Sequence, residues 1–145
     1  SVDLSAVSRN PEAFAAVGEA VAIQRALVQD DPAEFQADLA ISLTNLGVQL
    51  ADAGRKEEAV SATQEAVAIR RALVEDGEED VLPELAESLH NLASDLDDLS
   101  RRDEAIAAAR EALGIWRVLS EEAPGVFEDN LATEQSLLEH LKQVG

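Results

Sequence analysis

The chain has 145 residues, 30 of them acidic and 11 basic, so its formal net charge is −19. Its 46% hydrophobic content is that of a globular domain, and without cysteine it can form no disulfide and no cysteine-based metal or nucleophile site. The negative charge excludes nucleic acid and membrane surfaces as expected partners, because both are bound mainly by Lys and Arg clusters. No apolar stretch spans a bilayer and residues 1–4 lack signal-peptide features, so we expect a cytoplasmic protein.

Helices are favoured over strands along the whole chain, because Ala and Leu dominate and only 3% of residues are aromatic. Start signals include Asn10-Pro11 and Asp31-Pro32, where a capping side chain precedes a proline suited to the first helical position. Gly54 is a stop signal, since it suits a left-handed C-terminal cap. The predicted elements are a half-helix at 2–7 and helices at 11–29, 34–53, 56–75, 82–99, 102–121 and 126–143.

The sequence repeats itself with a period of 46 residues. The segment Glu19-Ala20-Val21-Ala22-Ile23 recurs at 65–69, and the same offset relates Asn45 to Asn91. Within one period an apolar helical stripe is followed by a second helix that starts with acidic residues, so each period predicts one antiparallel helix pair. The first stripe consists of Leu39, Leu43, Leu46 and Leu50.

We predict a single helical-repeat domain over residues 1–145. It divides into a partial repeat at 1–30, a repeat at 31–76, a repeat at 77–122 and a terminal capping helix at 123–145. Lys142 stands where Leu50 and Leu96 stand in the earlier copies, as expected for a last helix with nothing stacked beyond it. Because the chain opens within a repeat, we expect it to be a fragment of a longer protein.

The repeat resembles the tetratricopeptide repeat family. Leu43-x-x-Leu46-Gly47-x-x-Leu50 is similar to that family's first-helix pattern, and Ala59 and Ala66 stand at its two small second-helix positions. The second copy matches with Leu89, Leu92, Ala93, Leu96, Ala105 and Ala112. The period of 46 exceeds the usual length of about 34 and also suits HEAT-type pairs. Leu46-Gly47 followed by Glu57-Glu58-Ala59-Val60 favours the tetratricopeptide interpretation, in a long-repeat branch similar to kinesin light chain and actinobacterial regulatory proteins.

This resemblance implies an all-α fold, a right-handed α-solenoid of antiparallel helix pairs, acting as a noncatalytic protein-interaction module. First helices line the concave groove in the family, so the groove is expected to bind a partner peptide. The residues carried over to this surface are Ile41, Thr44, Asn45, Val48, Asp52, Glu87, His90, Asn91, Ser94, Asp98, Ser136 and His140.

Asn45 and Asn91 are the strongest candidates for partner contact. Asparagine in mid-helix lowers helix propensity and offers two donors and one acceptor, and the family's asparagine at this position contacts the backbone of a bound peptide. The alternative is that each amide bonds a neighbouring helix and fixes the packing of the repeats.

The chemistry of the groove favours a basic peptide with a small apolar anchor. Thr44, Val48 and Asp52 replace the basic carboxylate clamp of chaperone-binding members, so an acidic peptide terminus would meet like charge. The middle first helix is acidic instead, through Glu87, Asp95, Asp97 and Asp98. The alternative is that these carboxylates form an ordinary solvated face.

No enzyme, cofactor or metal site is expected. His90 and His140 are the only titratable candidates for chemistry, and neither has a second ligand at metal-binding spacing on its own helix. Trp116 replaces Gln24 and Arg70 of the other copies, which predicts a polar, exposed position and either a domain contact or a partly buried ring. The alternative function is a structural scaffold or spacer that packs in cis or self-associates through its N-terminal edge.

Overall fold

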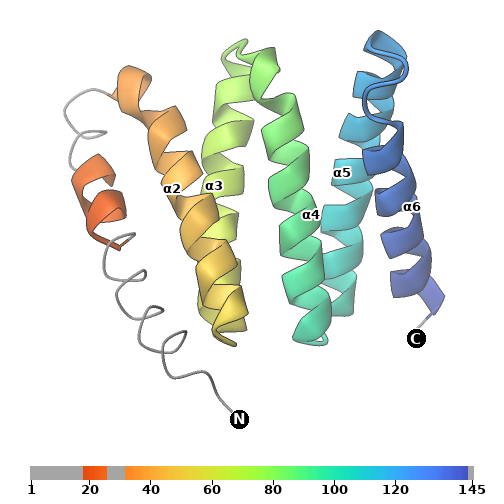
Figure 1. Cartoon of the computed structure of the whole chain (residues 1–145), viewed down its shortest axis with the longest axis horizontal. Coiled ribbons are helices and arrows are strands. Elements are labelled where there is room, and N and C mark those ends of the chain that lie inside the picture. The colour runs from red at the N-terminus through yellow and green to blue at the C-terminus, as the bar shows by residue number, and fades with distance from the viewer. Residues whose placement is uncertain (1–17, 26–31, 144–145) are drawn as a thin grey trace. The chain divides into compact units, whose positions relative to one another are not determined.

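The computed structural model describes residues 18–25 and 32–143, and every regular element in this part of the chain is a helix (Figure 1). Residues 18–25 are helical. The remaining elements are α2 (Pro32–Asp52), α3 (Lys56–Glu75), the short 3-10 helix η1 (Glu79–Val81), α4 (Leu82–Asp98), α5 (Arg102–Glu122) and α6 (Glu128–Gln143).

The all-α prediction is therefore confirmed, and five predicted helices are found with bounds within two residues of those expected. The predicted half-helix at 2–7 lies outside the described residues, as do the two ends of the helix predicted at 11–29. Among the helices described, none combines the length and apolarity that a membrane crossing requires.

The chain divides into two compact units, residues 1–69 and residues 70–145, which we call the first and second units. In the first unit α2 packs on α3 and on the helix at 18–25. One apolar cluster joins Val21, Leu39, Leu43 and Ala66, and a second joins Leu50, Ala59 and Ala62. The predicted stripe of leucines on α2 thus forms the core of this unit.

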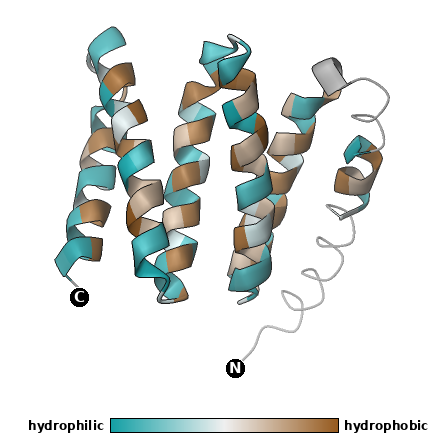
Figure 2. Cartoon of the chain, turned by 180° about the vertical axis from the view of Figure 1, so that it is seen from behind, coloured by the Kyte–Doolittle hydropathy of each residue, from teal (hydrophilic) through white to brown (hydrophobic). Residues whose placement is uncertain are grey.

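In the second unit α5 packs against both α4 and α6. The buried side chains follow helical spacing on each helix, and Figure 2 shows apolar residues alternating with polar ones along these helices. They include Leu85, Leu89 and Leu96 on α4, Ala105, Ala109, Ala112 and Trp116 on α5, and Leu138 and Leu141 on α6. Lys142 is exposed, whereas Leu50 and Leu96 at the equivalent positions are buried.

The turn that ends the first helix of each pair has the same backbone in both repeats. Gly54 has φ 80°, and the N–H of Arg55 donates to the Leu50 carbonyl at 2.8 Å. One repeat later Ser100 has φ 60°, and the N–H of Arg101 donates to the Leu96 carbonyl at 2.9 Å. This bond pattern is the left-handed C-terminal cap predicted from Gly54, here also formed by a serine.

Gly47 lets α2 and α3 approach closely. A Cβ atom at this position would lie 2.6 Å from the Thr63 hydroxyl oxygen, which is below any normal contact distance. In the second repeat the equivalent positions hold Ala93 and Ala109, and both are fully buried. The two repeats therefore divide the same interhelical space differently between their helices.

Two ion pairs recur with the period of the sequence. In the first unit Arg25 Nη2 lies 2.7 Å from Glu65 Oε1, and in the second unit Arg71 pairs with Glu111. Both pairs join residues 40 positions apart on the second helices of successive pairs.

Candidate partner-binding site

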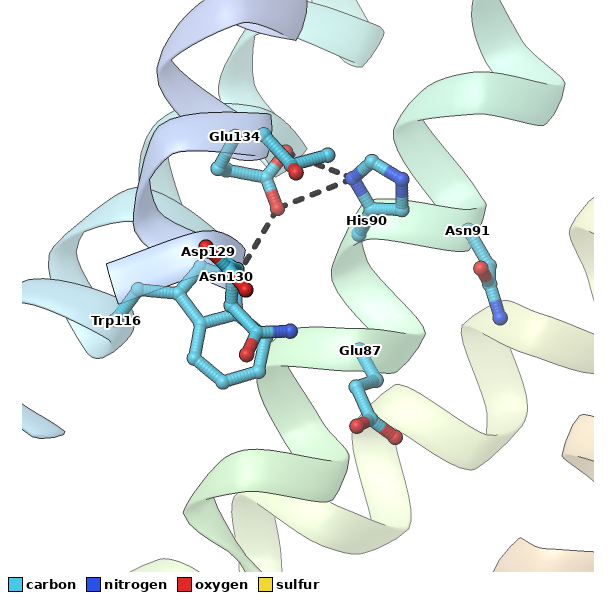
Figure 3. A pocket seen from close by; sticks show the side chains of 8 residues that line it. Glu87, His90, Asn91, Trp116, Asp129, Asn130 and Glu134 are labelled. Atoms are coloured by element: carbon cyan, nitrogen blue, oxygen red, sulfur yellow. Dashed lines mark hydrogen bonds and ion pairs between the residues drawn. The ribbon is translucent and has the colours of Figure 1, made fainter. Parts of the chain in front are cut away.

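A buried carboxylate joins three helices of the second unit. Glu134 on α6 is only 1% exposed, and its Oε1 accepts a hydrogen bond from Trp116 Nε1 on α5 at 3.3 Å. His90 Nδ1 on α4 lies 3.2 and 3.1 Å from the two carboxylate oxygens and donates to them (Figure 3). Because a buried charge is costly without partners, these two donors are what allow Glu134 to be buried here.

The same contact favours the protonated form of His90. The hydrogen bond to Glu134 raises the pKa of His90 above its ordinary value of 6.5, and the negative charge of Glu134 acts in the same direction. Partial burial opposes both effects without cancelling them. The His90–Glu134 contact is therefore an ion pair whenever His90 is protonated.

A cavity of about 320 Å³ opens beside this cluster. It is lined by Glu87, His90 and Asn91 from α4, Trp116 from α5, and Asp129, Asn130, Thr133 and Glu134 from α6. Figure 3 shows His90 and Glu87 of α4 on the side toward Asp129, Asn130 and Glu134 of α6, with the Trp116 ring beside Asn130, whereas Asn91 extends from α4 away from the α6 side chains. The pocket thus combines an aromatic ring, two amides and the His90–Glu134 contact with the exposed carboxylates of Glu87 and Asp129.

Three predicted site residues of the second unit line this pocket, namely Glu87, His90 and Asn91. The other four lie outside it and are exposed on α4 and α6: Ser94, Asp98, Ser136 and His140. His140 Nε2 lies 3.7 Å from Asp97 Oδ2, so each histidine contacts a carboxylate on the other helix.

In the first unit the predicted site residues lie on α2. Ile41 is 51% exposed and Val48 is 46% exposed, and Asn45 and Asp52 are also exposed. Thr44 is half-buried, and its hydroxyl donates to the Ala40 carbonyl of the same helix at 2.9 Å. These residues form one face of α2 that offers both apolar and polar contacts.

The side-chain amides of Asn45 and Asn91 form no hydrogen bond with any residue of the described ranges 18–25 and 32–143. The alternative in which these amides fix helix packing therefore finds no support among the described contacts. Asn91 lines the pocket, and Asn45 points from the exposed face of α2.

The prediction that Trp116 occupies an exposed position was wrong. Trp116 is 2% exposed and Arg70, at the equivalent position, is 6% exposed. Each faces the first helix of the following pair: Arg70 donates to the Ser88 hydroxyl, and Trp116 donates to Glu134. Trp116 also packs against Phe127, with ring centroids 5.8 Å apart. Both residues carry an N–H donor, and in the interior that donor forms a hydrogen bond with the next helix.

Sequence reasoning missed Glu134, the most buried charged residue of the described chain. Its equivalents are Ser42 and Ser88, so the acid replaces a serine at the same step at which tryptophan replaces arginine. The sequence did contain a signal for this contact, namely that both positions, 18 residues apart, change together in the second copy. At no place in the described residues do three His, Asp or Glu side chains come together as metal ligands would.

The family comparison agrees with the helix-pair geometry. The family profile described as tetratricopeptide repeat matches residues 39–79 and 85–123, which cover α2 to α5 apart from the ends of α2 and α4. A search of curated proteins finds no significant match to the chain. The profile match favours the tetratricopeptide repeat over the HEAT alternative. It does not distinguish the kinesin light chain branch from other members of the family. Repeats of this kind generally mediate protein–protein interaction and are typically noncatalytic. The chain belongs to the tetratricopeptide repeat family.

Proposed function

We propose that the chain is a noncatalytic interaction module that binds a segment of a partner protein on the exposed faces of its first helices. The observation that carries this proposal is the pocket between α4 and α6, with the Asn91 amide on its wall. An amide that bonds no other described residue keeps its donors and acceptor for the peptide groups of a ligand.

The charge of these faces favours a basic partner. Glu87, Asp98 and Asp129 are exposed on α4 and α6, within a chain of net charge −19. A field of one sign accelerates association with oppositely charged ligands and repels those of like charge. On α2 the exposed side chains of Ile41 and Val48 stand seven positions apart on one helix face, where they suit a small apolar anchor of the partner.

The test is affinity capture from the native source with mass spectrometry, comparing the wild-type chain with an Asn45→Ala, Asn91→Ala double variant. A partner retained by the wild type and lost by the double variant is the expected result. Gln64→Ala is the matched control, because it removes an exposed amide from the second helix α3. Circular dichroism checks that all variants keep their helicity.

Capture must also weaken with rising salt, because exposed charges are screened over about 10 Å at 0.1 M ionic strength. A partner that the double variant retains as well as the wild type would move the binding surface elsewhere. Loss of the partner in Gln64→Ala as well would show that the effect is not specific to the proposed face.

A second candidate function is self-association through the N-terminal edge, and one observation favours it. Ile23 on the helix at 18–25 is 61% exposed and so offers an apolar side chain for contact with a second copy. Sedimentation velocity over a hundredfold concentration range tests this function. Growth in mass that Ile23→Ser abolishes would support it, and a constant monomer mass would exclude it.

A further inference from the structure

We propose that the pocket between α4 and α6 binds one arginine side chain of the partner segment. This inference rests on the proposed function, which it deepens by assigning the basic anchor of the partner to one cavity. The cavity of about 320 Å³ lies at the small end of the range typical for ligand pockets, so it suits a single long side chain.

The acceptors of the pocket are distributed over two helices. Glu87 comes from α4, and Asp129 and Asn130 come from α6, so a ligand between them meets acceptor oxygens on both sides (Figure 3). A guanidinium group has five N–H donors in one rigid plane and can reach acceptors on two sides at once. A lysine ammonium is a compact point charge and cannot span them in the same way.

The charge available to a ligand comes from the rim of the pocket. Glu134 in the wall already accepts hydrogen bonds from His90 and Trp116. Glu87 and Asp129 are exposed, and neither forms a salt bridge with any residue in the described part of the chain. Glu87 interacts electrostatically with Arg70 but forms no salt bridge with it, so both rim carboxylates can still pair with a cation that enters from the solvent.

The inner wall of the pocket is formed by Trp116 and Glu134, both of which are almost completely buried. Trp116 is held in place by Glu134 and Phe127, and the small part of its ring that faces the pocket offers an apolar contact to the methylene stem of an incoming side chain. Neighbouring acidic residues on these helices, such as Glu139, do not line this cavity. The ring edge, the amides and the hollow between α4 and α6 thus distinguish this place from the rest of the acidic surface.

The probe is the peptide acetyl-Gly-Arg-Gly-amide, compared with the same peptide carrying citrulline, the uncharged isostere of arginine, and with the lysine peptide. Trp116 is the only tryptophan of the chain, so its fluorescence reports directly on the pocket. Amide shifts in NMR spectra identify the residues affected. We expect the arginine peptide to bind at least about tenfold more tightly than the citrulline peptide, since hydrogen bonds between charged groups are the strong ones. The lysine peptide is expected to bind with intermediate affinity.

Glu87→Gln and Asp129→Asn should each weaken arginine binding by about tenfold, and the two changes together should abolish the preference over citrulline. Glu139→Gln is the matched control, because it removes an exposed carboxylate of α6 outside the pocket. Equal binding of the arginine and citrulline peptides would overturn the inference, as would equal losses in Glu139→Gln and the two rim variants. Shift changes centred away from α4 and α6 would overturn it as well.

The two proposals fail separately. A captured partner that depends on Asn91, together with no arginine preference, leaves the proposed function standing and removes the arginine pocket. A pocket that prefers arginine, together with no captured partner, removes the proposed function and leaves a cation-binding site.

Discussion

The two repeats that the family profile matches, 39–79 and 85–123, meet the helix that follows them in different ways. After the first, Arg70 donates to the Ser88 hydroxyl and, at 3.4 Å, to the Glu84 carbonyl. After the second, Trp116 donates to Glu134, which also holds His90. Both links join residues 18 positions apart. The repeat therefore determines where a buried polar contact must be made, while the side chains that make it differ between copies.

The same holds for the contact between the two helices of each pair. Gly47 lies against Thr63 in the first unit, whereas Ala93 and Ala109 take the equivalent positions in the second. At these positions the first pair has no side chain on its first helix and a threonine on its second helix, whereas the second pair has one alanine on each helix. The backbone framework tolerates either division because the total volume is similar.

The largest effect is expected from breaking the link after the second repeat. Trp116→Ala removes a buried ring and one of the two donors to Glu134, so the free energy of unfolding should fall by about 3 to 5 kcal/mol. Urea titration followed by circular dichroism measures it. Trp116→Phe keeps most of the packing and loses only the N–H, so it should cost less. A loss below about 1 kcal/mol in Trp116→Ala would mean that Glu134 is held without this link.

A smaller effect is expected from exchanging the packing of the two repeats. Gly47→Ala should lower the free energy of unfolding by about 1 to 3 kcal/mol, because the new methyl group meets the Thr63 hydroxyl. Adding Thr63→Ala recreates the Ala93–Ala109 combination and should recover part of this loss. A double-mutant cycle in urea measures the coupling, and strict additivity would contradict the comparison of the two pairs.

The turns of the two repeats should respond in opposite directions. Ser100→Gly removes the strain of a left-handed serine and should raise the free energy of unfolding by roughly 0.5 to 1 kcal/mol. Gly54→Ala introduces that strain into the first repeat and should lower it by about 1 kcal/mol. Thermal unfolding compares the two variants with the wild type. A destabilised Ser100→Gly variant would indicate that the serine side chain stabilises its turn.

The smallest effect is expected from pH, because His90 is partly open to water. Its pKa is raised in the folded state, so the stabilisation from its proton is fully present below pH 6.5 and is lost as pH rises through the raised pKa. The stability difference between the wild type and His90→Gln should therefore shrink from pH 5 to pH 9. Glu134→Gln removes the cause of the shift, so in that background the difference should depend less on pH. An unchanged pH dependence there would assign the shift to another group.

The positions of the helices could be predicted because their signals are local. Gly54 marks one helix end, and the leucine stripe of α2 marks one buried face, so neither requires knowledge of the partner helix. The buried link could not be predicted in the same way. Arg70 looks like a surface residue in a helical pattern, and its burial depends on a serine 18 positions away.

The residues of the pocket likewise differ in whether a local pattern could predict them. The helix faces of Asn91 and Glu87 could be predicted from their place in the repeat, and both residues line the pocket. Glu134 was missed because its burial depends on two donors from two other helices, and a single sequence gives no indication of such a meeting. Whether the predicted residues of α2 and α4 contact a partner stays a prediction.

The recurring Arg–Glu pairs have a consequence for how such a chain can change length. Arg25 meets Glu65 and Arg71 meets Glu111 at the same spacing, so the second helix of one repeat already carries the partner for the second helix of the next. A duplication of residues 31–76 would supply a matching Arg and a matching Glu at the new junction without further substitution. Insertion or deletion of a whole repeat therefore leaves these Arg–Glu pairs intact.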